Sequence, residues 1–210
     1  MNNLLACNLA LGSLATGLAA QKTIVSPPYN TTKEGVTNQN YPFGYRSTTP
    51  TQRSHKYQHI HDNLSANAIV INSLAFRRDA STYPDYEAYS LDLELALSTA
   101  PVASGAMTST FANNLGPDLA TMIAKTKIKW PATVPGFGMP KPFVYQLPFD
   151  SGKSFPLAAS APLAWQAIVY DNDLDQVSAD YRYFDATYNT SSGTYSYYGQ
   201  GCMAPGQYQS

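Results

Sequence analysis

Four leucines at alternate positions are the feature of this sequence that most limits its fold. Residues 87–98, EAYSLDLELALS, carry apolar side chains at every second position, namely Leu91, Leu93, Leu95 and Leu97. Successive side chains of a β-strand point to opposite faces, so this pattern predicts a strand with one buried face. An α-helix repeats about every 3.6 residues and would not gather four alternate leucines on one side. The opposite face carries Asp92 and Glu94, which in such a position usually keep the strand soluble.

Other runs of β-forming residues lie on both sides of this segment. We expect strands at 68–76, 121–130, 142–148, 163–170, 179–187 and 194–198. Segment 68–76, AIVINSLAF, is apolar nearly throughout and predicts a strand buried on both faces. Residues 111–120 predict a turn of helix or a loop. Short strands at these intervals predict an all-β fold, an antiparallel β-sandwich, for which a jelly roll is a fitting topology.

The charge balance excludes several classes of partner. The chain of 210 residues has 13 Lys and Arg against 14 Asp and Glu, which gives a net charge of −1. Without a basic surplus, it lacks the electrostatic footprint of a nucleic-acid-binding protein and the polybasic segments that bind anionic membranes. Its 16 Tyr, 15 Pro and 13 Gly suit strands joined by turns.

The N-terminus predicts export. Residues 4–20, LLACNLALGSLATGLAA, are apolar or small and end in two alanines, as in a cleavable secretory signal. We therefore expect a signal peptide over 1–20, a secreted or cell-surface location, and no membrane contact beyond the signal peptide. Residues 21–53 are rich in turn formers and sparse in apolar residues, which predicts an extended N-terminal arm or edge strands outside the core. The β-sandwich domain is then expected over 54–200.

The cysteines suggest that the chain continues. Cleavage of the signal peptide would remove Cys7 and leave Cys202 as the only cysteine. A lone cysteine in a secreted protein suggests a disulfide partner elsewhere. Residues 201–210 are therefore expected to be the start of a truncated C-terminal segment.

All three histidines lie in one stretch of seven residues, HKYQHIH, at positions 55–61. On a strand they share one face, and the pair His59 and His61 could chelate one metal ion, as cupin-type sites do. Such a site also needs a carboxylate a few residues later and a further histidine, and the sequence has no fourth histidine. We therefore expect a polar, solvent-facing strand here, with a metal site as the alternative.

Alternating carboxylates after the expected strand at 163–170 offer a second candidate site. Asp171, Asp173 and Asp175 could converge on calcium, a hard cation that prefers oxygen ligands. The segment is not an EF-hand loop, because Gln176 and Arg182 stand where that loop has glycine and glutamate. A solvated acidic turn is the expectation, with structural calcium as the alternative cofactor; no other cofactor is expected.

The tyrosines of the C-terminal region offer a third candidate. Tyr195, Tyr197 and Tyr198 lie among Ser, Thr and Gly, in a tail that also contains Tyr181 and Tyr183. Exposed tyrosines can stack on sugar rings and hydrogen-bond through their hydroxyl groups. These residues are candidate ligands for polysaccharide or other cell-surface components, although tyrosines are also ordinary strand residues that pack on a sheet.

Several short phrases, taken in order, resemble a family of secreted, largely uncharacterised β-sandwich proteins of environmental bacteria. The phrases are Glu34-Gly35, Tyr41-Pro42-Phe43-Gly44, Tyr57-Gln58 with Asp62, Leu74-Ala75-Phe76-Arg77-Arg78-Asp79, Leu97-Ser98-Thr99-Ala100, Phe111-Ala112-Asn113-Asn114 and Pro148-Phe149-Asp150. The resemblance implies export and a β-sandwich, in many cases followed by a C-terminal sorting or anchoring segment, and it implies no reaction. Relatives read Gln-Gln-Val-Tyr-Asp where this chain has residues 58–62, so the histidines depart from the pattern.

Together these observations predict an exported, non-enzymatic structural or binding module of the cell surface or extracellular space. A carbohydrate-binding or carbohydrate-active secreted protein is the first alternative. A cupin-like metal-dependent enzyme using His59 and His61 is the second.

Overall fold

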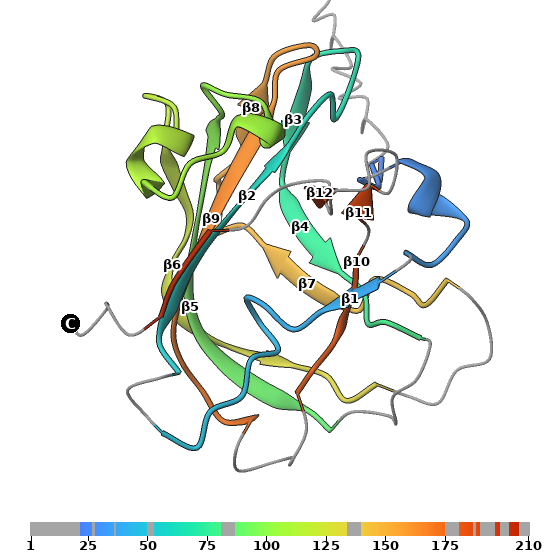
Figure 1. Ribbon diagram of the computed structural model, residues 1–210, viewed down its shortest axis with the longest axis vertical. Helices are drawn as coiled ribbons and strands as arrows, with labels where there is room; N and C mark the ends of the chain where they lie inside the picture. The colour runs from blue at the N-terminus through green and yellow to red at the C-terminus, as the bar shows by residue number, and fades with distance from the viewer. Residues whose placement is uncertain are drawn as a thin grey trace, which may run out of the picture.

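The computed structural model describes residues 22–26, 28–35, 37–49, 53–80, 87–133, 140–174, 181–186, 188–189, 196–197 and 202–205 (Figure 1). Within these residues the chain is all-β, with strands paired in antiparallel ladders, as the sequence predicts. The jelly-roll topology stays a prediction, and the expected signal peptide lies outside the described residues. None of the described segments forms a helix long and apolar enough to span a membrane.

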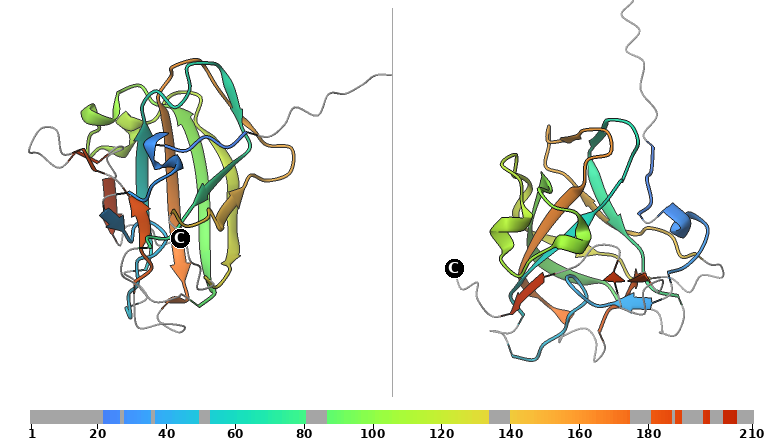
Figure 2. Two further views of the ribbon diagram at one scale, coloured as in Figure 1. Left: turned by 90° about the vertical axis from the view of Figure 1, so that its right-hand side faces the viewer. Right: turned by 45° about the horizontal axis from the view of Figure 1, so that its top comes forward.

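Five strands form the main sheet, in the order β13, β2, β9, β5 and β6, and Figure 2 shows the central ones side by side. Their bounds are His55–His61 for β2, Tyr89–Thr99 for β5, Ala120–Trp130 for β6, Leu163–Asn172 for β9 and Cys202–Pro205 for β13. The four alternate leucines of β5 are each 0% exposed. The prediction of a half-buried strand from their spacing is therefore confirmed.

Shorter ladders complete the fold. They are β1 (Thr37–Gln39) with β10 (Phe184–Ala186), β3 (Ile69–Ile71) with β8 (Phe155–Leu157), β4 (Ser73–Phe76) with β7 (Tyr145–Pro148), and β11 (Tyr188–Asn189) with β12 (Ser196–Tyr197). Phe155, Leu147 and Phe184 from three of these ladders share one core with the leucines of β5. Removing apolar surface from water contributes about 25 cal/mol per Å², so this shared core is what holds the layers together.

The expected strand at 68–76 differs from the structure. It is divided at Asn72 into β3 and β4, and Val70 in β3 is 61% exposed. Both strands pair on one side only, with β8 and β7 respectively. The prediction of a single strand buried on both faces is wrong because β3 and β4 belong to the outer ladders and leave one face to solvent.

The N-terminal segment contributes to the core, contrary to the expectation from its composition. Phe43 is 1% exposed and packs edge-on against Trp130 at a centroid distance of 5.2 Å. Farther upstream, Gly35 donates its backbone N–H to Asp185 at 2.6 Å, and Arg77 pairs with the same carboxylate. One aromatic anchor and one buried ion pair thus hold a segment that has few apolar residues.

The outer face of the main sheet is covered at one end by the segment between β5 and β6. This segment contains the 3₁₀ turns η3 (Ser104–Ala106) and η4 (Phe111–Asn114), so one turn of helix forms within the 111–120 region. A third 3₁₀ turn, η1 (Pro28–Thr31), lies near the N-terminus. Asn114 and Gln58 of β2 are each 0% exposed and hydrogen-bonded to each other, which seals this end of the face.

Candidate functional site

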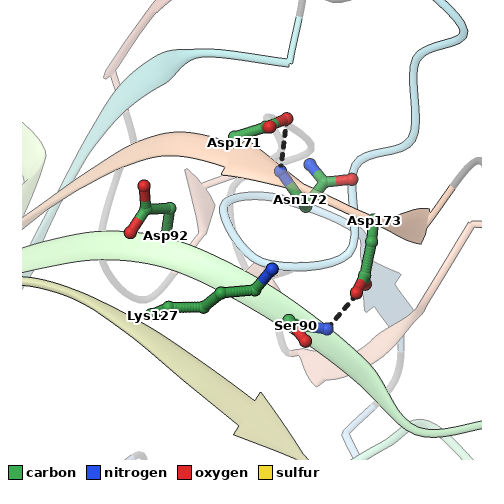
Figure 3. A pocket seen from close by; sticks show the side chains of 6 residues that line it. All are labelled: Ser90, Asp92, Lys127, Asp171, Asn172 and Asp173. Carbon is green, nitrogen blue, oxygen red and sulfur yellow. Dashed lines mark hydrogen bonds between the residues drawn. The ribbon is translucent and has the colours of Figure 1, made fainter.

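A polar hollow of about 160 Å³ opens where β5, β6 and β9 run together, at the other end of the main sheet (Figure 3). Six residues line it: Ser90, Asp92, Lys127, Asp171, Asn172 and Asp173. Three carboxylates, one ammonium group and one hydroxyl therefore lie around a single small volume. The amide of Asn172 is buried and already bonded, to the carbonyl of Tyr45 and the backbone N–H of Leu174.

Strand register brings these residues together. Asp92 on β5 lies opposite Lys127 on β6 and opposite Asp171 on β9. The pairing of β5 with β9 shifts register next to Asp92, so that Val169 pairs with Leu93 and Tyr170 is passed over. This extra residue in β9 turns Asp171 toward the same outer face as Asp92.

Local hydrogen bonds fix two of the carboxylates. Asp173 accepts the backbone N–H of Ser90 at 2.6 Å, which ties the end of β9 to β5. Asp171 accepts the backbone N–H of Asn172 at 2.8 Å and lies 3.5 Å from the guanidinium of Arg53. The side chain of Asp171 remains 60% exposed, so it is also open to a ligand. Such a set of oxygens and nitrogens can accept and donate hydrogen bonds to a hydroxyl-rich molecule.

The structure brings Asp171 and Asp173 to one site, while Asp175 lies outside the described residues. In the described part of the chain, no group of three or more His, Cys, Asp or Glu side chains is arranged to hold a metal ion. Asp171 points to the outer face of β9, whereas Asp173 turns back to β5. Calcium binding by the 171–175 segment stays a prediction.

The histidines of β2 face the core side of the sheet. His59 pairs across the strands with Trp165, whose ring lies 5.5 Å away, and His59 and His61 lie 4.5 Å apart, centroid to centroid. His55, on the same face, is 1% exposed. The prediction of a solvent-facing strand is wrong, because β2 lies inside the sheet and both of its faces are covered.

Both ring nitrogens of His61 are engaged. The indole N–H of Trp165 donates to Nε2 at 3.1 Å, and Nδ1 lies 2.8 Å from Oγ of Ser26. An indole nitrogen can only donate, so the neutral His61 carries its proton on Nδ1 and donates it to Ser26. His61 therefore cannot take a proton from Ser26, and its Nε2 lone pair already accepts a hydrogen bond instead of facing a metal ion.

Burial sets the protonation of these histidines. Burial, with a smaller contribution from His59, lowers the pKa of His61 well below its usual value. Burial also lowers the pKa of His55, although hydrogen bonds to the carbonyl groups of Pro42 and Arg53 act in the opposite direction. The imidazole of His61 is therefore neutral at neutral pH.

Of the three tyrosines predicted to bind a ligand, only Tyr197 lies within the described residues. Tyr195 and Tyr198 lie outside the described residues, and for Tyr197 only its place in β12 is described. Two other tyrosines of the same tail, Tyr181 and Tyr183, lie next to Tyr41 and Tyr45 from the N-terminal segment.

Sequence reasoning missed half of the residues that line the hollow, and it missed the two N-terminal tyrosines. Ser90, Lys127 and Asn172 carry no motif, and only the strand register places them together. For Tyr41 and Tyr45, their spacing around a Pro-Phe-Gly turn was the one available signal.

Comparisons with protein-family models, with curated proteins and with solved structures find no match. The resemblance described from the sequence therefore stays a prediction.

Proposed function

We propose that the protein is an exported, non-enzymatic binding module of the cell surface or extracellular space. The observation that supports this best is the polar hollow, where carboxylate and ammonium groups stand on three strands and face outward. Groups fixed on strands keep their geometry without a ligand, so binding costs little conformational entropy.

The hollow suits recognition of a hydroxyl-rich ligand such as a polysaccharide. Asp92 and Asp171 supply acceptors, and Lys127 supplies a donor on the neighbouring strand. Two observations speak for binding rather than catalysis. The hollow is small, with an exposed carboxylate at its rim. His61 carries its proton on Nδ1, facing Ser26, and therefore cannot take a proton from this serine. The apolar N-terminal segment supports export.

The binding proposal is tested by retention of the purified mature chain on insoluble polysaccharides and on isolated cell envelopes. We expect retention, and we expect Asp92→Asn combined with Lys127→Met to weaken it roughly tenfold, as the loss of two charge-assisted hydrogen bonds predicts. Lys153→Gln is the matched control, because this lysine lies in the loop before β8 and pairs with Asp150 instead. A wild-type chain that no polymer or envelope retains would contradict the proposal.

A further inference from the structure

Four tyrosines from two distant segments form a continuous row of rings, which we call the tyrosine cluster: Tyr41, Tyr45, Tyr181 and Tyr183. Tyr41 and Tyr45 stack at a centroid distance of 4.6 Å with an interplanar angle of 15°. Tyr45 meets Tyr181 at 5.9 Å, and Tyr181 meets Tyr183 at 6.3 Å. The row thus crosses from the N-terminal turn to the segment that leads into β10.

The base of the cluster is rigid. Between the stacked tyrosines, Phe43 points into the core and is 1% exposed. Gly44 lies against residue 182, since a Cβ on this glycine would come within 1.8 Å of the carbonyl oxygen of Arg182. The backbone N–H of Arg182 donates to the carbonyl of Gly44 at 3.0 Å. Only glycine permits this approach, and the approach sets the distance between the two pairs of tyrosines.

His55 supports the cluster from below. Its Nε2 lies 2.6 Å from the carbonyl oxygen of Pro42, in the turn between the stacked tyrosines. Its ring meets Tyr41 and Tyr45 edge-on, at centroid distances of 5.3 and 6.0 Å. A buried strand residue therefore holds the orientation of two rings at the surface.

The rings reach the surface although they are large and aromatic. Tyr181 is 38% exposed and the other three are half-buried. Burial, followed by the phenol groups of Tyr45 and Tyr181, raises the pKa of Tyr41 and keeps this tyrosine neutral. The nearby Arg53 and Asp171 pair with each other at 3.5 Å. The cluster thus presents uncharged rings and hydroxyl groups.

The cluster adjoins the polar hollow. Asn172, which lines the hollow, donates its side-chain N–H to the carbonyl of Tyr45 at 3.2 Å. One end of β9 therefore carries hydrogen-bonding groups on one side and aromatic rings on the other. This combination fits a pyranose chain, whose C–H faces pack on aromatic rings while its hydroxyl groups exchange hydrogen bonds with carboxylate and ammonium groups.

We propose that the tyrosine cluster is a stacking site for the sugar rings of a neutral polysaccharide, and that the polar hollow binds hydroxyl groups of the same chain. This inference rests on the proposed binding function and adds the ligand class and the residues that select it. A self-associating surface would use the same exposed rings, so the test includes the oligomeric state.

The experiment measures retention of the mature chain on cellulose, xylan and mannan, with chitosan and pectin as charged polymers. We expect retention on at least one neutral polymer, roughly tenfold weaker binding for Tyr181→Ala, and near wild-type binding for Tyr181→Trp. Phe111→Ala is the matched control, since Phe111 is a half-buried aromatic residue in η4, at the opposite end of the sheet. Tyr181 is exposed, so its substitution leaves the fold intact, which a thermal melt verifies.

The outcomes separate the two proposals. Retention of wild type together with undiminished retention of both Tyr181→Ala and Tyr45→Ala would overturn the tyrosine site and leave the binding function standing. Retention on the charged polymers alone would overturn the assignment of a neutral ligand. Dimers that sedimentation detects in wild type and not in Tyr181→Ala would assign the rings to self-association and overturn the inference. Failure of wild type to bind any polymer or cell envelope would overturn the function itself.

Discussion

On one face of β2, Gln58 is buried among other amides. It donates to the side chain of Gln166 at 2.9 Å and to the carbonyl of Phe111 at 3.1 Å, and it accepts from Asn114 at 3.0 Å. On the opposite face, His61 lies between the indole of Trp165 and the hydroxyl of Ser26. The same seven-residue strand thus buries polar side chains on both faces. Their partners are amides on one face and aromatic and hydroxyl groups on the other.

The two faces of β2 differ in whether their stability depends on pH. Amides do not titrate in the physiological range, so the closed amide face depends on its hydrogen-bond partners and not on pH. Imidazoles do titrate, and that of His61 is neutral because its surroundings disfavour the charge. A buried polar strand is therefore stabilised in two ways that separate experiments can distinguish.

The largest effect is expected on the amide face. Gln58→Ala removes three hydrogen bonds, to Gln166, Asn114 and the carbonyl of Phe111, and opens a small cavity, so we expect a loss of about 3 kcal/mol in the free energy of unfolding. Urea denaturation measures it. The double variant with Asn114→Ala should lose less than the sum of the single losses, because the two residues share a hydrogen bond. Strict additivity, or a loss below about 1 kcal/mol, would contradict a closed network.

A smaller effect, dependent on pH, is expected on the histidine face. Burial lowers the pKa values of His61 and His55 in the folded protein below the ordinary value of 6.5. Below pH 6.5 the unfolded chain therefore binds more protons than the folded chain, so stability is complete above this pH and falls as the pH decreases through it.

Urea midpoints at about pH 7.5, 6.5 and 5.5 check this sign. The variant His61→Asn should show a flatter profile over this range, while Gln58→Ala should keep the wild-type slope at lower overall stability. A wild-type midpoint that does not change between the highest and lowest pH would contradict the assignment of neutral, buried imidazoles.

Ser26→Ala should have a still smaller effect. It removes the acceptor for Nδ1–H of His61 at a half-buried position, which we expect to cost about 1 kcal/mol. Thermal unfolding would show this as a lower melting temperature at neutral pH. Ser26→Thr keeps the hydroxyl group and should retain most of the stability; an equal loss in both variants would indicate that packing, and not the hydrogen bond, is responsible.

The smallest effect is expected at the open end of the outer face. Lys127 is exposed in the polar hollow, so Lys127→Met should change the free energy of unfolding by less than about 0.5 kcal/mol. A loss as large as that of Gln58→Ala would remove the distinction between a closed structural half and an open half available to a ligand.

The sequence predicts correctly which side chains of a strand are buried when the residue spacing within that strand alone decides it. The leucines of β5 sort to one face because their spacing matches the strand period, whatever the neighbours are. Exposure of β2 could not be predicted in this way, because it depends on β9 beside it and on Asn114 above it, both far away in the chain. The polar composition of β2 was misleading, since Gln58, His55 and His61 have hydrogen-bond partners from distant segments.

The candidate site shows the same limit. Asp171 and Asp173 stand out in the sequence as alternating carboxylates. Asp92 and Lys127 lie beside them only because of the strand register, which includes a one-residue shift that no local sequence pattern predicts. Likewise, Tyr45 and Tyr181 meet because Gly44 lets two backbone segments approach, and sequence alone does not reveal a contact over that separation.

The order of the main sheet has a consequence for the chain before it folds. Gln58 of β2 and Gln166 of β9 are neighbours in the sheet but 108 residues apart in sequence, and β13, on the other side of β2, comes later still. Pairing over such separations is slow, typically in milliseconds to seconds for β-rich domains. Throughout that time β2 is a strand without partners, and apolar strands in this condition associate with other chains. A lysine, a glutamine and three histidines interrupt the apolar residues of β2. The polar groups that the native sheet buries therefore also oppose aggregation of the newly made chain before β9 and β13 pair with β2.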